Sequence, residues 1–338
     1  MKVLVLGGTA FLGRHAVEAA LAQGHEVTIF TRGRTNPDLF PEVEHLLGDR
    51  DGALGALAGR SWDGVVDTSG YVPRVVRQSA ELLLDAAGRY AFVSSISVYA
   101  DFSSPVNESS PVAQLESPAS EDVDGDYGAL KAACERVLEE VYGERSARVR
   151  AGLLVGPHDP TGRFTYWPRR LAAGGDVLAP GDPAAPVQFV DARDLGAWLV
   201  RLALEGPGGV FNATGPAREL SMRAMLAGVR QGTKSKVAFV WLANDFLKVQ
   251  GVGEDRFPLY APPVGETAGF HRANIARALA HGLKFRPVAD TAAATLTWYQ
   301  SLPADLQARI APQFEKRPNE TPWLETEQRV LAASRKRR

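Results

Sequence analysis

The feature that most restricts the fold is an apolar run near the N-terminus that ends directly in two glycines. Residues 3–6 are apolar, Gly7 and Gly8 follow, and apolar residues then recur at helical spacing as far as Gly24. A second apolar run occupies residues 27–30. Short apolar runs are typical of buried strands, so this order predicts a strand–helix–strand unit whose first turn is tight.

The same alternation of strand and helix patterns continues well beyond this unit. The further predicted elements cover residues 45–47, 64–67, 75–87, 90–94, 127–142 and 147–154. We therefore predict an α/β protein with a Rossmann doubly wound parallel sheet, in which ligands bind at the carboxyl ends of the strands.

The pattern becomes irregular after Gly156, where prolines separate short elements. This change predicts a smaller C-terminal substrate-binding domain. We expect a nucleotide-binding domain over residues 1–155 and a mainly substrate-binding part over residues 156–315, with segments that return to the sheet. Residues 316–338 are predicted to form a C-terminal tail.

The glycine turn predicts a cradle for a phosphate group. Glycine allows the backbone to approach a pyrophosphate, whose charge the helix N-terminus stabilises. Many turns use glycine for geometry only, but this one follows the first strand of a strand–helix–strand repeat, which favours a cofactor site. The predicted cofactor contacts in this turn are Gly7, Thr9, Ala10, Phe11, Leu12 and Gly13.

The end of the second predicted strand indicates which dinucleotide is bound. An NAD site usually has an Asp or Glu there, to accept hydrogen bonds from the adenosine ribose. This chain has Thr31, Arg32 and Arg34 instead. A guanidinium binds a phosphate by charge-assisted hydrogen bonds, so we predict NADP(H) as the preferred cofactor, with NAD(H) as the alternative.

Tyr127 and Lys131 form the candidate catalytic pair. They lie four residues apart in a predicted helix and therefore share one face. A nearby ammonium favours the phenolate and is expected to lower the pKa of Tyr127 toward neutrality. A serine at the end of the fifth strand, within residues 94–97, can hydrogen-bond the substrate oxygen.

These motifs resemble the extended (atypical) short-chain dehydrogenase/reductase superfamily, in its NAD-dependent epimerase/dehydratase group. Gly7, Ala10 and Gly13 are similar to its GxxGxxG pattern, with alanine in place of the middle glycine. The resemblance implies that Tyr127 and Lys131 are its YxxxK pair and that Lys131 also binds the nicotinamide ribose. Counted back from Val98-Tyr99, Ser95 completes the implied catalytic triad.

The resemblance also implies further contacts. Asp49 and Arg50 look like the family's adenine-contacting Asp and its neighbour, and the turn of Thr68, Ser69 and Gly70 lies where the family approaches the pyrophosphate and ribose. Residues 156–167 look like an isoflavone-reductase-like bacterial subgroup. The predicted substrate contacts are Ser97, His158, Arg163 and Trp167, although a structural loop held by Pro and Asp turns explains 156–167 equally well. No metal-ligand spacing surrounds His158.

Composition limits the partners. The 38 Lys and Arg residues nearly balance 39 Asp and Glu residues, which argues against a nucleic-acid partner. No apolar run approaches the roughly 20 residues of a membrane span. The single cysteine, Cys134, and the strand pattern at residues 1–7 favour a reducing, cytoplasmic location. We expect a small-molecule substrate and allow a homodimer through residues 75–87 and 127–142.

Three function classes remain open. The first is an NADP(H)-dependent carbonyl/alcohol reductase, the second an epimerase or dehydratase of a nucleotide sugar, and the third a non-catalytic nucleotide-sensing or RNA-associated protein. The triad argues against the third. Leu153 and Val187 stand where sugar-modifying members carry Asn and Arg, so the sequence favours the reductase and predicts that nucleotide sugars are not substrates.

Overall fold

The computed structural model describes residues 1–310 and 321–336. Its core is a parallel sheet of seven strands in the order β10-β6-β5-β4-β1-β2-β3. The sequence prediction of a doubly wound α/β fold is confirmed. The strands are β1 (Lys2–Leu6), β2 (Glu26–Thr31), β3 (Glu44–Leu47), β4 (Trp62–Asp67), β5 (Ala87–Ser95), β6 (Ser146–Ala151) and β10 (Gly209–Ala213).

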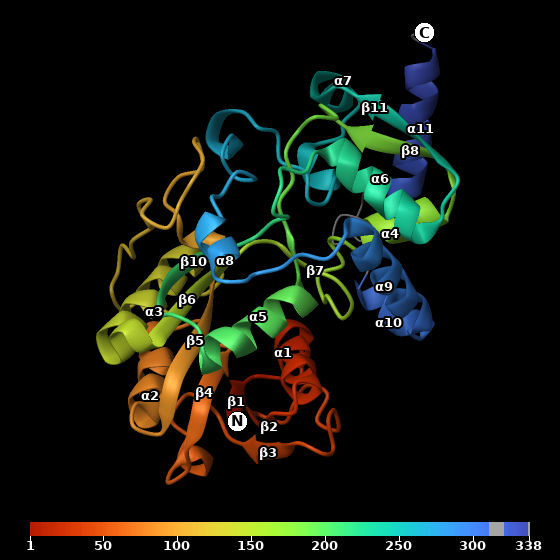
Figure 1. Cartoon of the computed structure of the whole chain (residues 1–338). Coiled ribbons are helices and arrows are strands. Elements are labelled where there is room, and N and C mark those ends of the chain that lie inside the picture. The colour runs from red at the N-terminus through yellow and green to blue at the C-terminus, as the bar shows by residue number, and fades with distance from the viewer. Residues whose placement is uncertain (311–320, 337–338) are drawn as a thin grey trace.

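Helices cover both faces of this sheet (Figure 1). One face carries α1 (Phe11–Ala22) and α5 (Ala192–Leu204), which pack against each other. The other carries α2 (Pro73–Leu83) and α3 (Tyr127–Tyr142). The predicted helix over residues 75–87 therefore ends earlier than expected, because Ala87 already begins β5.

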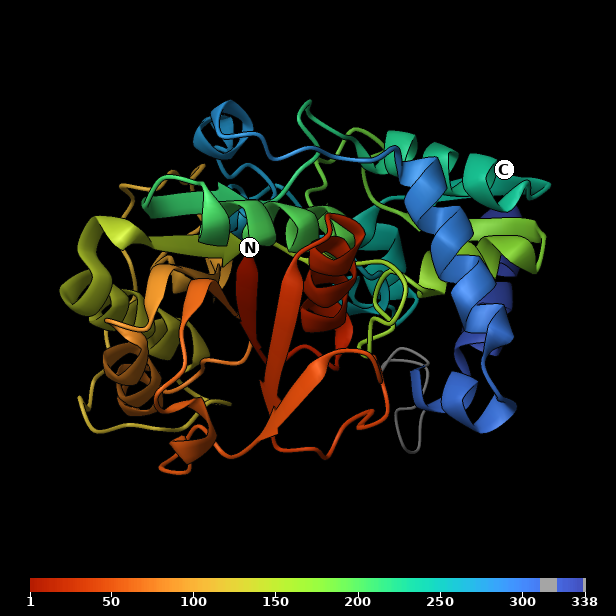
Figure 2. The ribbon, with the colours of Figure 1, turned by 60° about the horizontal axis from the view of Figure 1, so that its bottom comes forward.

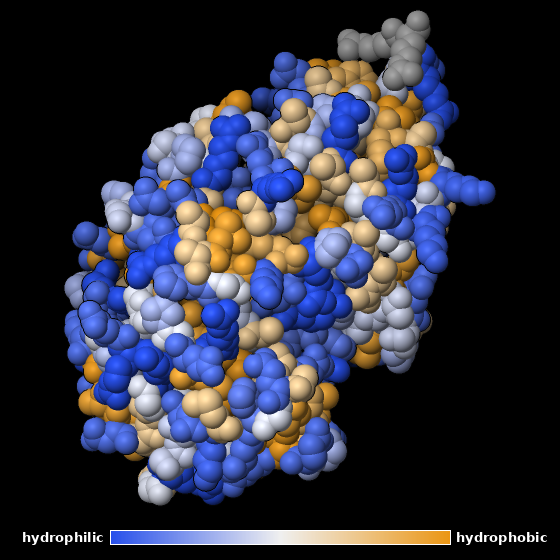
Figure 3. All heavy atoms as spheres, viewed as in Figure 1, coloured by the Kyte–Doolittle hydropathy of each residue, from blue (hydrophilic) through white to orange (hydrophobic). Residues whose placement is uncertain are grey.

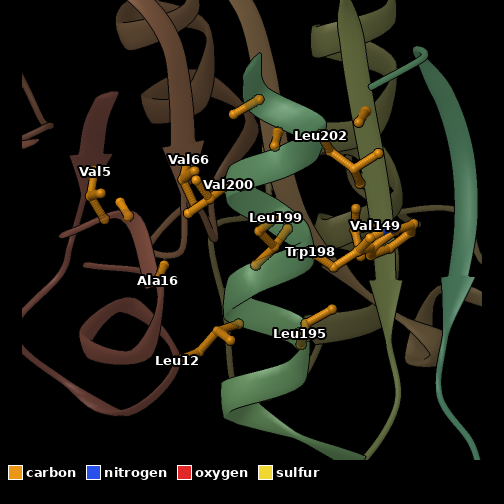
Figure 4. Close-up of a cluster of buried hydrophobic side chains, with 14 of the residues drawn as sticks. Val5, Leu12, Ala16, Val66, Val149, Leu195, Trp198, Leu199, Val200 and Leu202 are labelled. Atoms are coloured by element: carbon orange, nitrogen blue, oxygen red, sulfur yellow. The ribbon is translucent and has the colours of Figure 1, made fainter. Parts of the chain in front are cut away.

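The apolar face of α5 forms much of the core on its side of the sheet. Leu195, Trp198, Leu199 and Leu202 recur at helical spacing and are buried, and Figure 4 shows them directed toward the strands and α1. Their neighbours include Val149 of β6. The sheet is buried on both faces, which explains why residues 3–6 read as a continuous apolar run rather than an alternating one.

The second half of the chain forms a smaller lobe at one end of the sheet, at the upper right of Figure 1. Its short strands β8 (Gly175–Pro180) and β11 (Val237–Leu242) pair in parallel, and β7 (Leu154–Val155) pairs with β9 (Val190–Asp191). Its helices are α4 (Tyr166–Ala172), α6 (Met222–Thr233), α7 (Asn244–Val249), α9 (Val288–Ser301), α10 (Ala304–Ile310) and α11 (Trp323–Arg335). Helix α8 (Ala276–Ala280) instead packs beside β10 of the main sheet, as Figure 2 shows from another side.

The predicted C-terminal tail requires a correction. Residues 323–335 form α11, and Trp323, Val330 and Leu331 are buried in the core of the smaller lobe. Glu327 on the same helix forms an ion pair with Arg170 of α4 and accepts the backbone N–H of Leu178. Residues 316–320, 337 and 338 of the predicted tail lie outside the described residues.

Candidate active site

The glycine turn between β1 and α1 has the backbone of a phosphate cradle. Gly7 and Gly8 have φ angles of +106° and +101°, which side chains rarely tolerate. A Cβ atom on Gly13 would lie 2.6 Å from the backbone nitrogen of Gly8. Ala10, the residue just before α1, supplies no side-chain cap, so the first backbone N–H groups of the helix are available to an anion.

A cavity of about 750 Å³ runs along the carboxyl ends of the strands from this turn. Its volume lies in the range of small-molecule and cofactor sites. The residues predicted from sequence that line it are Gly7, Thr9, Ala10, Phe11, Leu12, Gly13, Thr31, Arg32, Arg34, Asp49, Arg50, Thr68, Ser69, Ser95, Tyr127 and Lys131. The structure thus brings the proposed dinucleotide contacts and the proposed triad to one cavity.

Lys131 is the most constrained member of the triad. It is 3% exposed, and its Nζ donates to the carbonyl oxygens of Gly70 at 2.5 Å and Val93 at 2.6 Å. Burial lowers the pKa of Lys131 to about 8. An ammonium has three N–H donors, so two carbonyl partners leave one donor for a ligand in the cavity.

Tyr127 and Ser95 lie on the same part of the cavity wall. Burial raises the pKa of Tyr127, while a side-chain hydrogen bond with Ser95 and the charge of Arg163 act in the opposite direction. The expectation that Lys131 lowers this pKa is therefore wrong for this structure, because desolvation dominates. Ser95 ends β5, and its Oγ accepts the backbone N–H of Ser97 at 3.0 Å, which leaves the hydroxyl proton free to donate.

Two arginines line the cavity next to the end of β2. Arg32 and Arg34 follow β2, are exposed and line the cavity. Neither guanidinium has an ion-pair partner among the residues that the structure describes. Unpaired guanidinium groups at this position suit a phosphate on the adenosine half of a dinucleotide.

Arg50 follows Asp49, the residue that the resemblance implies as the adenine contact. Its side chain is directed into the protein, where Nη1 and Nη2 bind the two oxygens of Asp67 at 2.6 and 2.8 Å. The residue is 8% exposed. Arg50 lines the cavity, but Asp67 engages both of its terminal nitrogens and holds the guanidinium in place, so its role as a cofactor contact stays a prediction.

None of the four predicted substrate contacts lines this cavity, and two of them pack within the protein. Trp167 is fully buried in the core of the smaller lobe, and its Nε1 donates to the carbonyl of Pro258 at 2.8 Å. The His158 ring packs 5.2 Å from that of Trp298, and its Nδ1 lies 3.3 Å from an Arg14 nitrogen, at the junction of α1 and α9. Both predictions of a substrate contact are therefore corrected to roles in packing.

The other two predicted substrate contacts are placed differently. Arg163 is partly buried, and its Nε donates to the Thr161 hydroxyl at 3.0 Å. Its electrostatic effect on Tyr127 is consistent with a place near the reacting atoms, and its role stays a prediction. The Ser97 side chain is exposed and does not line the cavity; the structure records its backbone N–H on Ser95.

Sequence reasoning missed Tyr71 as a site residue. It lines the cavity at 45% exposure, and its ring centroid is 6.5 Å from that of Tyr127. The Lys131 Nζ lies 5.2 Å from the centre of the same ring. The available signal was the position of Tyr71 just after β4, where side chains face the ligand edge of a parallel sheet.

The described residues contain no group of three or more His, Cys, Asp or Glu side chains that is able to hold a metal ion. No helix among them has the length and apolar character required to cross a membrane.

Hydrophilic residues cover most of the face shown in Figure 3, with smaller apolar areas between them.

Comparison with known proteins identifies the family of this chain. The sequence pattern of the NAD dependent epimerase/dehydratase family matches residues 3–214, a stretch that contains the glycine turn and the whole triad. The chain belongs to this family. A chloroplast stem-loop binding protein of 41 kDa (b) from Arabidopsis thaliana is 26% identical over 212 residues, which cover 57% of this chain and 53% of that protein. The match thus spans about half the length of this curated relative.

Solved structures of the family share the fold over nearly the whole chain. The UDP-glucuronic acid 4-epimerase of Bacillus cereus, solved in complex with NAD, is 17% identical and covers 90% of this chain and 99% of its own, with a TM-score of 0.62. The UDP-Glc/GlcNAc 4-epimerase of Campylobacter jejuni is 14% identical, covers 89% of this chain and 99% of its own, and has a TM-score of 0.64. At these identities the similarity to solved structures shows the shared fold alone. The family match over residues 3–214 favours the epimerase/dehydratase alternative over the carbonyl reductase that the sequence analysis placed first.

Proposed function

We propose that this protein is an NAD(P)-dependent epimerase-type enzyme that oxidises a secondary alcohol and reduces the resulting ketone again on the same bound cofactor. The observation that carries the proposal is the shared cavity, in which Ser95, Tyr127 and Lys131 lie along the wall that continues from the glycine turn. A protein that only bound nucleotides would have no chemical need for this triad.

The residues fit the cofactor. The uncapped N-terminus of α1 suits the pyrophosphate, the remaining N–H of Lys131 suits a ribose hydroxyl, and the unpaired Arg32 and Arg34 suit the 2′-phosphate of NADP. We therefore propose NADP(H) as the preferred form. When bound, the oxidised cofactor supplies a hydride acceptor and a positive charge.

Tyr127 is proposed to move the proton. In the oxidation, the alcohol O–H passes its proton to the Tyr127 oxygen as the carbon-bound hydrogen leaves as hydride. In the return step Tyr127 gives a proton back to the ketone oxygen while hydride returns to the opposite face of the carbonyl carbon, which inverts that centre. Oxidation needs the phenolate, which the positive charge of Arg163 favours. Reduction needs the phenol, which the raised pKa of Tyr127 maintains at neutral pH. The Ser95 hydroxyl donates to the reacting oxygen and holds it beside Tyr127.

A carbonyl/alcohol reductase is the second candidate, and one observation favours it. Val187 is fully buried and Leu153 is partly buried at positions where sugar-modifying relatives are expected to carry Arg and Asn. Apolar side chains there offer a diphosphate no hydrogen bond.

Incubation with oxidised cofactor and a panel of UDP- and dTDP-sugars separates the two candidates. The epimerase proposal predicts that a sugar epimer accumulates, detected by nuclear magnetic resonance, without a matching build-up of NAD(P)H. One-for-one consumption of NADPH with simple ketones or aldehydes, and no binding of any nucleotide sugar, would overturn it in favour of the reductase.

A further inference from the structure

A buried polar network lies directly below the catalytic wall. The Asp67 side chain, at the end of β4, is fully buried and binds both terminal nitrogens of Arg50. Tyr90 of β5 donates its hydroxyl to the same carboxylate at 2.7 Å, and Arg50 also donates to Ser79 of α2 at 2.7 Å. A two-pronged pair with additional hydrogen bonds is the arrangement that tolerates burial.

This network fixes the backbone turn whose carbonyl oxygen accepts a hydrogen bond from Lys131. Asp67 accepts the backbone N–H of Ser69 at 3.0 Å, and Arg50 donates to the Ser69 hydroxyl at 3.3 Å. The next carbonyl, that of Gly70, accepts the hydrogen bond from Lys131. Only the backbone of Ser69 and Gly70 therefore lies between the Asp67 carboxylate and the Lys131 ammonium.

The network also contributes charge at Lys131. Asp67 raises the pKa of Lys131 and Arg50 lowers it, so the two effects oppose each other. Burial raises the pKa of Cys134 to about 12, so its thiol is neutral. Glu135 also raises the Lys131 pKa, but it is paired with Arg150 at 2.8 Å. The remaining titratable neighbours are the phenols of Tyr71, Tyr90 and Tyr127.

We propose that Arg50 and Asp67 are positioning residues for Lys131: Asp67 fixes the turn that receives the ammonium, and Arg50 cancels the carboxylate charge beneath it. The inference rests on the proposed role of Lys131 in cofactor binding. It predicts opposite consequences for the two members of one ion pair. Loss of Arg50 leaves a negative charge below the ammonium, whereas loss of Asp67 leaves a positive charge.

The test is the pH dependence of NADPH affinity, measured by nucleotide fluorescence between pH 7 and pH 10 on full-length variants whose folding is checked by circular dichroism. In the wild type we expect affinity to fall as Lys131 loses its proton, with a midpoint that Lys131→Met removes. Arg50→Met moves the midpoint up and Asp67→Asn moves it down, each by on the order of one pH unit. The double variant returns it toward the wild-type value.

Two variants guard against a purely structural explanation. Tyr90→Phe removes a hydrogen bond of the same network but no charge, so the midpoint stays at its wild-type value. Arg50→Lys keeps the charge and loses the two-pronged contact, so the midpoint is retained while NADPH binds more weakly. This variant carries the test if Arg50→Met or Asp67→Asn does not fold.

The outcomes separate the two claims. If Lys131→Met leaves the pH dependence intact, the proposed role of Lys131 fails. If Lys131→Met removes the midpoint but Arg50→Met and Asp67→Asn leave it unmoved, or move it in the same direction, the positioning network is overturned and the role of Lys131 stands. Wild-type affinity in Arg50→Lys would likewise contradict the positioning of the turn.

Discussion

Two groups of residues were predicted to be functional, and the structure places them in different surroundings. Ser95, Tyr127 and Lys131 line one cavity, whereas Trp167 lies in the core and His158 packs between two helices. The triad was predicted from the helical spacing of Tyr127 and Lys131, from the serines that end the fifth strand, and from the family resemblance. The substrate contacts of the loop at 156–167 were predicted from a resemblance and from residue types. The comparison teaches that several agreeing signals, here helix spacing, a strand end and a family motif, predict which residues meet in a cavity more dependably than residue type in a loop.

The largest expected effect is on turnover in Tyr127→Phe. Removal of the transferable proton lowers turnover by about 10²–10⁴-fold, while the ring and therefore the NADPH dissociation constant are preserved. Steady-state rates and calorimetric titration measure the two quantities. Tyr71→Phe is the matched control, since it removes a phenol from the same cavity and is expected to retain most activity. Near-normal turnover in Tyr127→Phe would remove Tyr127 from the mechanism.

Trp167→Ala tests the second group of residues, by asking whether Trp167 serves packing or substrate binding. Truncation of a fully buried tryptophan lowers the free energy of unfolding by about 3–5 kcal/mol, measured by urea denaturation. NADPH affinity of the folded fraction stays within about twofold, because Trp167 does not line the cavity. A variant of wild-type stability with impaired turnover would restore Trp167 as a substrate contact.

Arg32→Ala tests whether Arg32 binds the 2′-phosphate at the adenosine end of the cofactor. Charge-assisted hydrogen bonds contribute about 1.5–3 kcal/mol each, so NADPH affinity falls roughly tenfold or more while NADH affinity is unchanged. Added salt weakens NADPH binding in the wild type more than in the variant. Arg218→Ala, at an exposed arginine outside this cavity, is the control. Equal affinity of the wild type for NADPH and NADH contradicts the NADP preference.

The smallest expected effect concerns His158. Burial lowers its pKa to about 4, below the ordinary value of 6.5, with contributions from Arg14 and His15. Between pH 6.5 and 4 the unfolded chain therefore binds a proton at His158 that the folded protein does not bind. The free energy of unfolding falls as the pH falls through this window. His158→Gln reduces this loss in urea denaturation at pH 7 and pH 5. An unchanged pH dependence shows that His158 is not responsible.

The fold was predictable because it depends on patterns that survive in a single sequence. Continuous apolar runs and glycines at strand ends identify a parallel sheet, and the sheet places Ser95 near the helix that carries Tyr127. Helix α11 was not predictable in the same way. Its packing depends on Trp323 and Glu327 meeting partners more than 100 residues earlier, and such pairings leave no local pattern.

Arg50 shows why the site was only partly predictable. Sequence placed it correctly at a strand end, where its chemistry suits a ligand, but its side chain turns inward to Asp67. That choice is decided by an acidic partner 17 residues later in the chain, at the end of β4, which β1 and β2 separate from β3 in the sheet. The raised pKa of Tyr127 has a similar origin, since desolvation depends on burial, which the spacing of Tyr127 and Lys131 does not reveal.

A crystal structure of the protein with NADP⁺ tests most directly the central claim that both ends of the cavity serve one dinucleotide. The account predicts the pyrophosphate on the first backbone N–H groups of α1, the 2′-phosphate at Arg32 and Arg34, and the nicotinamide end beside Tyr127 and Lys131. A cofactor bound outside this cavity, or bound with its adenine against Tyr127, would contradict it.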